Sequence, residues 1–135
     1  MTTLDQGDVA TRLPAQDLER ARRFYEEKLG LKPVEERPGG LLYRSGNGHF
    51  ALFQSAGKPS GTHTQMGWTV PDLASTISEL RAHGVVFEEY DVPGLTTVDG
   101  IATIVGNYPS KGTGELGAWF KDSEGNLLGI GQPTR

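Results

Sequence analysis

The spacing of apolar and polar residues changes along the chain, and the same series of changes occurs twice. Residues 9–15 alternate with a period of two, which is typical of a half-buried strand. After Asp17, apolar residues recur every three or four positions, which predicts an amphipathic helix. Asp17 can accept hydrogen bonds from the free N–H groups of the first turn, and Gly30 is a typical helix stop. We therefore predict a helix between these two residues.

The second copy of this pattern begins near residue 65. Residues 65–70 read as a strand, Asp72 is again a suitable N-cap, and Gly84 again follows the last apolar position of the helix. Further strands are predicted at 31–37, 41–45 and 49–54 in the first copy, and at 85–90, 101–105, 115–121 and 127–131 in the second, with a loop at 92–100.

Repetition at this period indicates two copies of one supersecondary unit. We predict an α+β fold in which two βαβββ modules form a curled mixed sheet around a cleft, with the helices outside. One domain spans residues 1–135, with module one at about 8–55, a Ser-, Gly- and Pro-rich linker at 56–63, and module two at about 64–132.

Composition narrows the functional classes. The chain has 135 residues and a formal net charge of -4, without a basic block that would favour nucleic acid or an anionic membrane surface. Cysteine is absent, which excludes disulfides, thiolate metal sites and a cysteine nucleophile. No apolar run is long enough to span a membrane, and the first residues lack the apolar segment of a signal peptide. We expect a cytoplasmic protein without nucleic-acid or membrane partners.

Two segments carry a resemblance to a known family. The stretches "LERARRFYEEKLGL" after the first strand and "DSEGNLLG" near the end resemble the vicinal oxygen chelate superfamily, which includes glyoxalase I, bleomycin-resistance proteins and extradiol dioxygenases. The resemblance covers most of the chain and implies the duplicated βαβββ fold. It also implies a homodimer and a small organic molecule as ligand, but it does not select one activity.

The resemblance also implies where a divalent metal would be bound. The four ligand positions of family enzymes correspond to Ala10, Phe53, Gln65 and Gly129 in this sequence. Alanine, phenylalanine and glycine have no side-chain lone pair, and a single amide does not hold a divalent metal against water. We therefore expect no metal and no other cofactor.

These four positions, together with side chains expected on the same faces of the strands, yield candidates for a ligand-binding site. The candidates are Arg12, His49, Phe53, Gln65 and Trp119. Arg12 could clamp a carboxylate or phosphate, or pair with an internal acid. Trp119 could stack on a flat ligand, or pack in the core. The histidines could rebuild a metal site from His49, His63 and Glu115, although lone histidines are more often structural.

No catalytic residue is identified, because the chain has no nucleophile elbow and its adjacent acid pairs point to opposite faces of a strand. Residues 108–117 read as a flexible connection or a lid. The leading hypothesis is a metal-independent protein that binds a metabolite or sequesters an antibiotic-like compound. The alternative is a glyoxalase-like lyase or dioxygenase, with a rebuilt metal site or metal-free acid–base chemistry. A partner-binding subunit with an incidental cavity is the third hypothesis.

Overall fold

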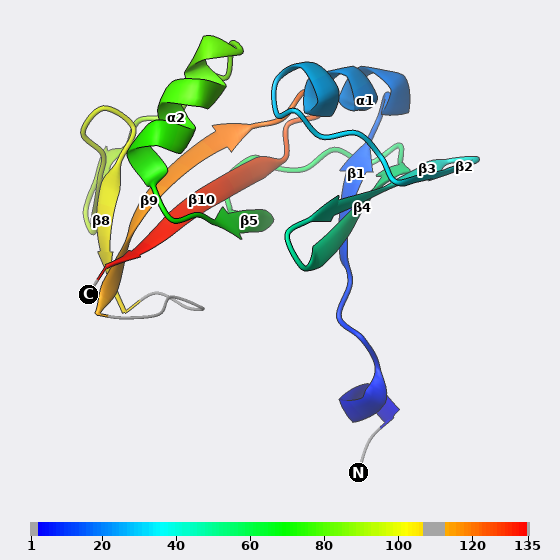
Figure 1. Ribbon diagram of the computed structural model, residues 1–135, viewed down its shortest axis with the longest axis horizontal. Helices are drawn as coiled ribbons and strands as arrows, with labels where there is room; N and C mark the ends of the chain where they lie inside the picture. Colours follow the sequence, from blue (N-terminus) through cyan, green and yellow to red (C-terminus); the bar gives the residue numbers. More distant parts are fainter. Residues whose placement is uncertain (1–2, 107–112, 135) are drawn as a thin grey trace.

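The computed structural model of the protein describes residues 3–106 and 113–134 (Figure 1). A short 3-10 helix, η1 (Thr3–Gln6), precedes the first module, which contains β1 (Thr11–Ala15), α1 (Leu18–Glu27), β2 (Glu35–Arg37), β3 (Gly40–Ser45) and β4 (Gly48–Gln54). The second module contains β5 (Met66–Thr69), α2 (Leu73–Ala82), β6 (Asp91–Val92), β7 (Leu95–Thr96), β8 (Ala102–Val105), β9 (Gly114–Lys121) and β10 (Leu127–Thr134).

The two modules have the same sheet topology. The strand order is β1-β4-β3-β2 in the first sheet and β5-β10-β9-β8 in the second. In each sheet the first and last strands of the module pair in parallel, and the remaining pairs are antiparallel. The predicted α+β class with two βαβββ modules is confirmed. The two mixed sheets lie side by side, each with its own helix, and do not form a closed barrel (Figure 1).

Both predicted helix caps are present. An Asp17 carboxylate oxygen accepts a hydrogen bond from the N–H of Arg20 at 3.0 Å, and Asp72 accepts one from the N–H of Ser75 at 3.1 Å. Gly30, with a positive φ of 72°, lies just beyond the end of α1, a position that favours glycine. Local sequence signals therefore fix the limits of the helices.

The predicted strand over residues 85–90 is wrong. Phe87 forms an isolated bridge with Phe120, and the N–H of Glu88 donates to the carbonyl oxygen of Trp119 at 2.8 Å, but residues 85–90 form no strand. The Glu89 carboxylate instead accepts a hydrogen bond from the Thr97 hydroxyl at 2.6 Å, so that a side chain organises this segment. The strands β6 and β7 form a small hairpin that overlaps the loop predicted at 92–100.

The apolar faces of the two sheets meet in a single core. Tyr43 and Phe50 of the first sheet stack with ring centroids 5.0 Å apart, and Tyr25 of α1 packs against both. Phe50 then contacts Trp68 of the second sheet edge to face, and Trp68 stacks on Phe120. This line of rings joins the modules through their buried faces and leaves the opposite faces of the sheets open.

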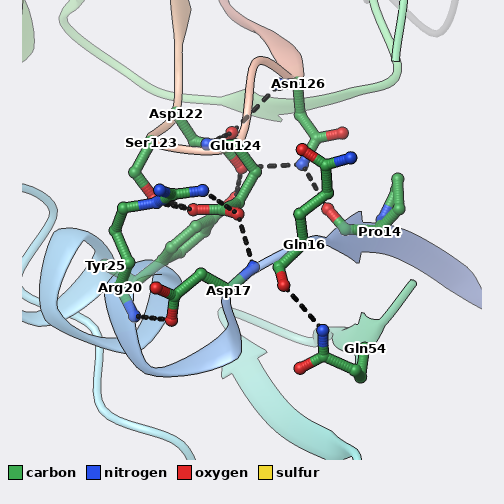
Figure 2. A network of polar contacts seen from close by, with 10 residues as sticks. All are labelled: Pro14, Gln16, Asp17, Arg20, Tyr25, Gln54, Asp122, Ser123, Glu124 and Asn126. Atoms are coloured by element: carbon green, nitrogen blue, oxygen red, sulfur yellow. Dashed lines mark hydrogen bonds and ion pairs between the residues drawn. The ribbon is translucent and has the colours of Figure 1, made fainter. Parts of the chain in front are cut away.

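A buried polar turn also joins the modules (Figure 2). Asp122, between β9 and β10, accepts hydrogen bonds from the Tyr25 hydroxyl at 2.7 Å and from the Asn126 side-chain amide at 2.9 Å. The Asn126 amide also donates to the carbonyl oxygen of Pro14 in β1, at 3.0 Å. Burial and the neighbouring carboxylate of Asp122 raise the pKa of Tyr25 well above its usual value, so the hydroxyl remains a donor.

Glu124 completes this connection, and its side chain is only 1% exposed. Its carboxylate accepts hydrogen bonds from Arg20 Nε at 2.9 Å, Arg20 Nη2 at 3.0 Å and the Asp17 N–H at 3.0 Å (Figure 2). Burial opposes ionisation, but these bonds and one from Ser123 outweigh it and lower the pKa of Glu124 to about 2. We call the contacts of Asp122, Glu124 and Asn126 with the first module the inter-module network.

Candidate functional site

The four positions at which the family implies metal ligands do not offer a set of donors. Ala10 lies just before β1, Phe53 lies in β4 opposite Pro14, and Gly129 lies in β10 opposite Gly67. None of Ala10, Phe53 and Gly129 has a side-chain atom that coordinates a cation, so these residues do not fit a divalent metal.

Gln65, the fourth position, uses its side chain for structure. Its Nε2 donates to Asn126 Oδ1 at 2.9 Å, and its Oε1 accepts from the N–H of Leu127 at 3.3 Å. Both ends of the amide therefore hold the start of β10 against the start of β5. The interaction also connects Gln65 to the inter-module network.

The open face of the first sheet carries a hollow of about 320 Å³. Arg12 of β1 and His49 of β4 both line it and are both exposed. Among residues 3–106 and 113–134, no carboxylate lies within ion-pair distance of Arg12. The hollow therefore combines a guanidinium and an imidazole on a surface that is open to solvent.

The open face of the second sheet carries a larger hollow, of about 420 Å³. Trp119 and Glu115 of β9, Thr69 of β5 and Ile104 of β8 line it, together with glycines of three strands. The indole of Trp119 is held edge to face against Tyr90, with ring centroids 5.7 Å apart. This hollow offers an aromatic surface next to a carboxylate.

The placement of the predicted site residues differs from the single cleft that the sequence suggested. Arg12 and His49 lie in the first hollow and Trp119 in the second, while Phe53 is 36% exposed on the first sheet. Each hollow is lined by one module, because the apolar faces of the sheets pack against the helices and are joined to each other through Phe50 and Trp68. A single chain does not bring these residues together.

The residues that could rebuild a metal site are also separated. His49 lines the first hollow, Glu115 lines the second, and His63 lies near Ser60, with Nδ1 3.4 Å from the serine Oγ. Over the part of the chain that the structure describes, no three His, Cys, Asp or Glu side chains gather as a metal ion would require. Residues 108–112, half of the predicted lid, lie outside the described residues.

Sequence reasoning recognised Glu115 only as a possible metal ligand and missed its place beside Trp119. The alternation of β9 contains the signal, because Glu115, Gly117 and Trp119 have the same phase. Their common orientation follows once β9 is known to pair with β10 along its whole length.

Comparison with models of protein families identifies the superfamily of the chain. The model of the Glyoxalase/Bleomycin resistance protein/Dioxygenase superfamily matches residues 8–130. The chain belongs to this superfamily. No curated protein sequence matches the chain significantly. The superfamily includes metal-dependent enzymes. Ala10, Phe53 and Gly129 therefore stand at positions where those enzymes carry the ligands of their metal centre.

Solved structures show the same fold at low sequence identity. A glyoxalase/bleomycin resistance protein/dioxygenase from Alicyclobacillus acidocaldarius has 16% identity and a TM-score of 0.70, covering 96% of this chain and 92% of that one. A protein from the mobile metagenome of V. Pseudocholerae has 20% identity and a TM-score of 0.66, covering 96% and 95%. A lactoylglutathione lyase from Agrobacterium tumefaciens has 20% identity and a TM-score of 0.61, covering 93% and 92%.

Neither helix within the described residues is long and apolar enough to cross a membrane.

Proposed function

We propose that this protein is a metal-independent small-molecule-binding member of the superfamily, which binds a metabolite or sequesters an antibiotic-like compound. The observation that carries the proposal is the replacement of the metal donors. Ala10, Phe53 and Gly129 supply none, and both ends of the Gln65 amide are bonded within the chain. The open sheet faces nevertheless retain two hollows that a small organic molecule can enter.

The proposed binding residues are Arg12, His49, Phe53, Gln65 and Trp119. Trp119 supports a flat ligand, because aromatic faces bind flat organic molecules well. Arg12 and His49 supply polar contacts to a molecule in the first hollow, which is separate from the hollow of Trp119. Gln65 acts through the position of β10, since its amide holds Asn126 and the N–H of Leu127.

Metal analysis tests the first half of the proposal. The protein is incubated with Zn²⁺ or Ni²⁺, freed of unbound ions and analysed by ICP mass spectrometry. We expect far less than one ion per chain, in the protein and in a Gln65→Ala variant alike. One tightly retained ion per chain, lost when His49 is replaced by alanine, would overturn metal independence.

A thermal-shift screen tests the second half. Metabolites and aromatic natural products are screened, and a true ligand raises Tm as its concentration increases. At a ligand concentration one hundred times Kd, the free energy of unfolding increases by about 2.7 kcal/mol. Thr69→Phe, which fills the second hollow, is the blocking variant, and Thr103→Phe on the other face of the same sheet is its control. A broad screen without any concentration-dependent shift would refute the binding function.

The lactoylglutathione lyase among the structural neighbours defines the competing outcome. Turnover of methylglyoxal and glutathione is measured with and without added Ni²⁺ or Zn²⁺. We expect no turnover above the uncatalysed rate. Metal-stimulated turnover that disappears in His49→Ala would replace the binder with a lyase.

We further propose that two copies associate in solution through the open face of the first sheet. Val9, fully exposed, lines the first hollow, and Phe53, 36% exposed, lies on the same face of the sheet by the alternation of β4. A second copy would remove this apolar surface from water. Light scattering after gel filtration is expected to give the mass of a dimer, weakened by Val9→Lys. Val86→Lys, at an exposed valine of the second module, is the control. A monomer at micromolar concentration would contradict the proposal.

A further inference from the structure

The floor of the second hollow is made of backbone. Gly67, Gly117, Gly129 and Gly131 lie on β5, β9 and β10 and all line the hollow. By strand alternation, these glycines lie on the same face of the sheet as Glu115 and Trp119. The glycines have no side chains, which leaves space on this face for the side chains of Glu115 and Trp119. The hollow therefore exists because these positions lack a Cβ.

Glu115 lies directly against this floor. A Cβ built on Gly131 would be 2.5 Å from Glu115 Cδ, a distance at which one of the two groups must move. Any other residue at position 131 would therefore push the carboxylate from its place. Because Gly131 has no side chain, the Glu115 carboxylate can lie over the middle of the sheet, where the Glu115 side chain is half-buried.

Trp119 lies beside it, above two further glycines. A Cβ on Gly129 would be 3.4 Å from indole Cδ1, and a Cβ on Gly117 would be 3.2 Å from indole Cη2. The indole thus extends over both glycines, and Tyr90 holds its orientation from the side. The indole and the carboxylate are neighbours with a shared floor.

The described residues that line the hollow carry charge of one sign. Glu115 is the sole charged residue among its described lining residues, and Thr64 and Thr69 add hydroxyl groups. A carboxylate attracts cations and repels anions, and the face of an indole also attracts cations. A carboxylate has two oxygens and accepts several hydrogen bonds, so a bond within the chain leaves it able to accept another.

We propose that the second hollow selects an organic cation, with its positive nitrogen at Glu115 and a flat apolar body on Trp119. This inference rests on the proposed binding function and adds the class of ligand. Glu115 and Trp119 are the residues that determine the specificity, and Gly131 is the position that permits Glu115 to lie there.

Three probes of one shape test the preference in the full chain. These are 1-methylquinolinium as the cation, 1-methylnaphthalene as the neutral compound and 1-naphthoate as the anion, titrated by ligand-observed NMR. We expect the cation to bind about tenfold more tightly than the neutral probe, and the anion more weakly than both. Glu115→Gln is expected to remove most of that tenfold preference while leaving the neutral probe within about twofold.

Matched variants separate local from general effects. Glu79→Gln removes the same charge from an exposed position of α2 and is expected to leave all three affinities unchanged. Thr69→Phe is expected to abolish binding of every probe, and Thr103→Phe to preserve it. Thermal unfolding of each variant establishes that it is folded.

The outcomes distinguish this inference from the function on which it rests. Equal affinity for the three probes, lost in Thr69→Phe, would support a binding hollow and overturn the cation preference. An equal loss of cation binding in Glu79→Gln and Glu115→Gln would also overturn it, since the effect would then be that of net charge. If no probe binds, the cation site is refuted, and the broad thermal-shift screen alone decides the binding function.

Discussion

The contacts of the inter-module network predict how much the free energy of unfolding decreases in the variant Glu124→Gln. The wild-type carboxylate is 1% exposed and is bonded to Arg20 and to the N–H of Asp17. A change in pKa from 4.5 to about 2 on folding corresponds to roughly 3 kcal/mol. Arg20 is 48% exposed, and solvent screening reduces the expected loss to about 2 kcal/mol.

The pH dependence follows from the direction of this change. The pKa of Glu124 is lower in the folded protein than in the unfolded chain, so its contribution is complete above about pH 4.5 and is lost as the pH falls toward 2. Glutamine does not titrate. The difference in the free energy of unfolding between wild type and Glu124→Gln is therefore expected to be largest at pH 7 and smaller at pH 3.

Urea unfolding followed by circular dichroism at both pH values gives this difference, provided that the m-values agree. Glu27→Gln, an exposed position on α1, is the control and is expected to change stability by less than about 0.5 kcal/mol. A double-mutant cycle with Arg20→Gln isolates the coupling across the modules. A Glu124→Gln variant as stable as wild type, or a loss of the same size at pH 3 and pH 7, would refute the reasoning.

Three further substitutions test individual contacts by urea unfolding at pH 7. Tyr25→Phe removes a donor from the buried Asp122 carboxylate and is expected to cost about 1–3 kcal/mol; an unchanged midpoint would contradict the buried bond. Gln65→Leu leaves Asn126 Oδ1 without this donor and is expected to cost about 1–2 kcal/mol, whereas a stabilised variant would argue against its structural role. Asp72→Ala removes an N-cap and is expected to cost about 1 kcal/mol; no loss would mean that another group satisfies the first turn of α2.

The local elements were largely predictable because their signals lie within a few residues. Asp17 and Asp72 cap their helices as predicted, and the strands predicted at 41–45, 49–54 and 127–131 are present. The failure at residues 85–90 has a different origin. Glu89 bonds to Thr97, a contact between residues that only the folded loop brings together.

The candidate site was predictable in part. The family resemblance located the positions at which the family carries its metal ligands, among them Ala10 and Gln65. Residue types alone then excluded a conventional donor set. The bonds of Gln65 with Asn126 and Leu127 could not be inferred, because they depend on how β10 lies against β5.

The sequence by itself determined the duplicated architecture, the helix limits and the lack of a side-chain donor at Ala10, Phe53 and Gly129, since each depends on periodicity, on capping or on the chemistry of single side chains. Only the tertiary structure decided which faces of the two sheets meet. Their apolar faces pack together through Phe50 and Trp68, and each open face therefore carries a hollow of its own. The place of Glu115 over Gly131 has the same origin, because a cross-strand contact becomes visible only when the strands are paired.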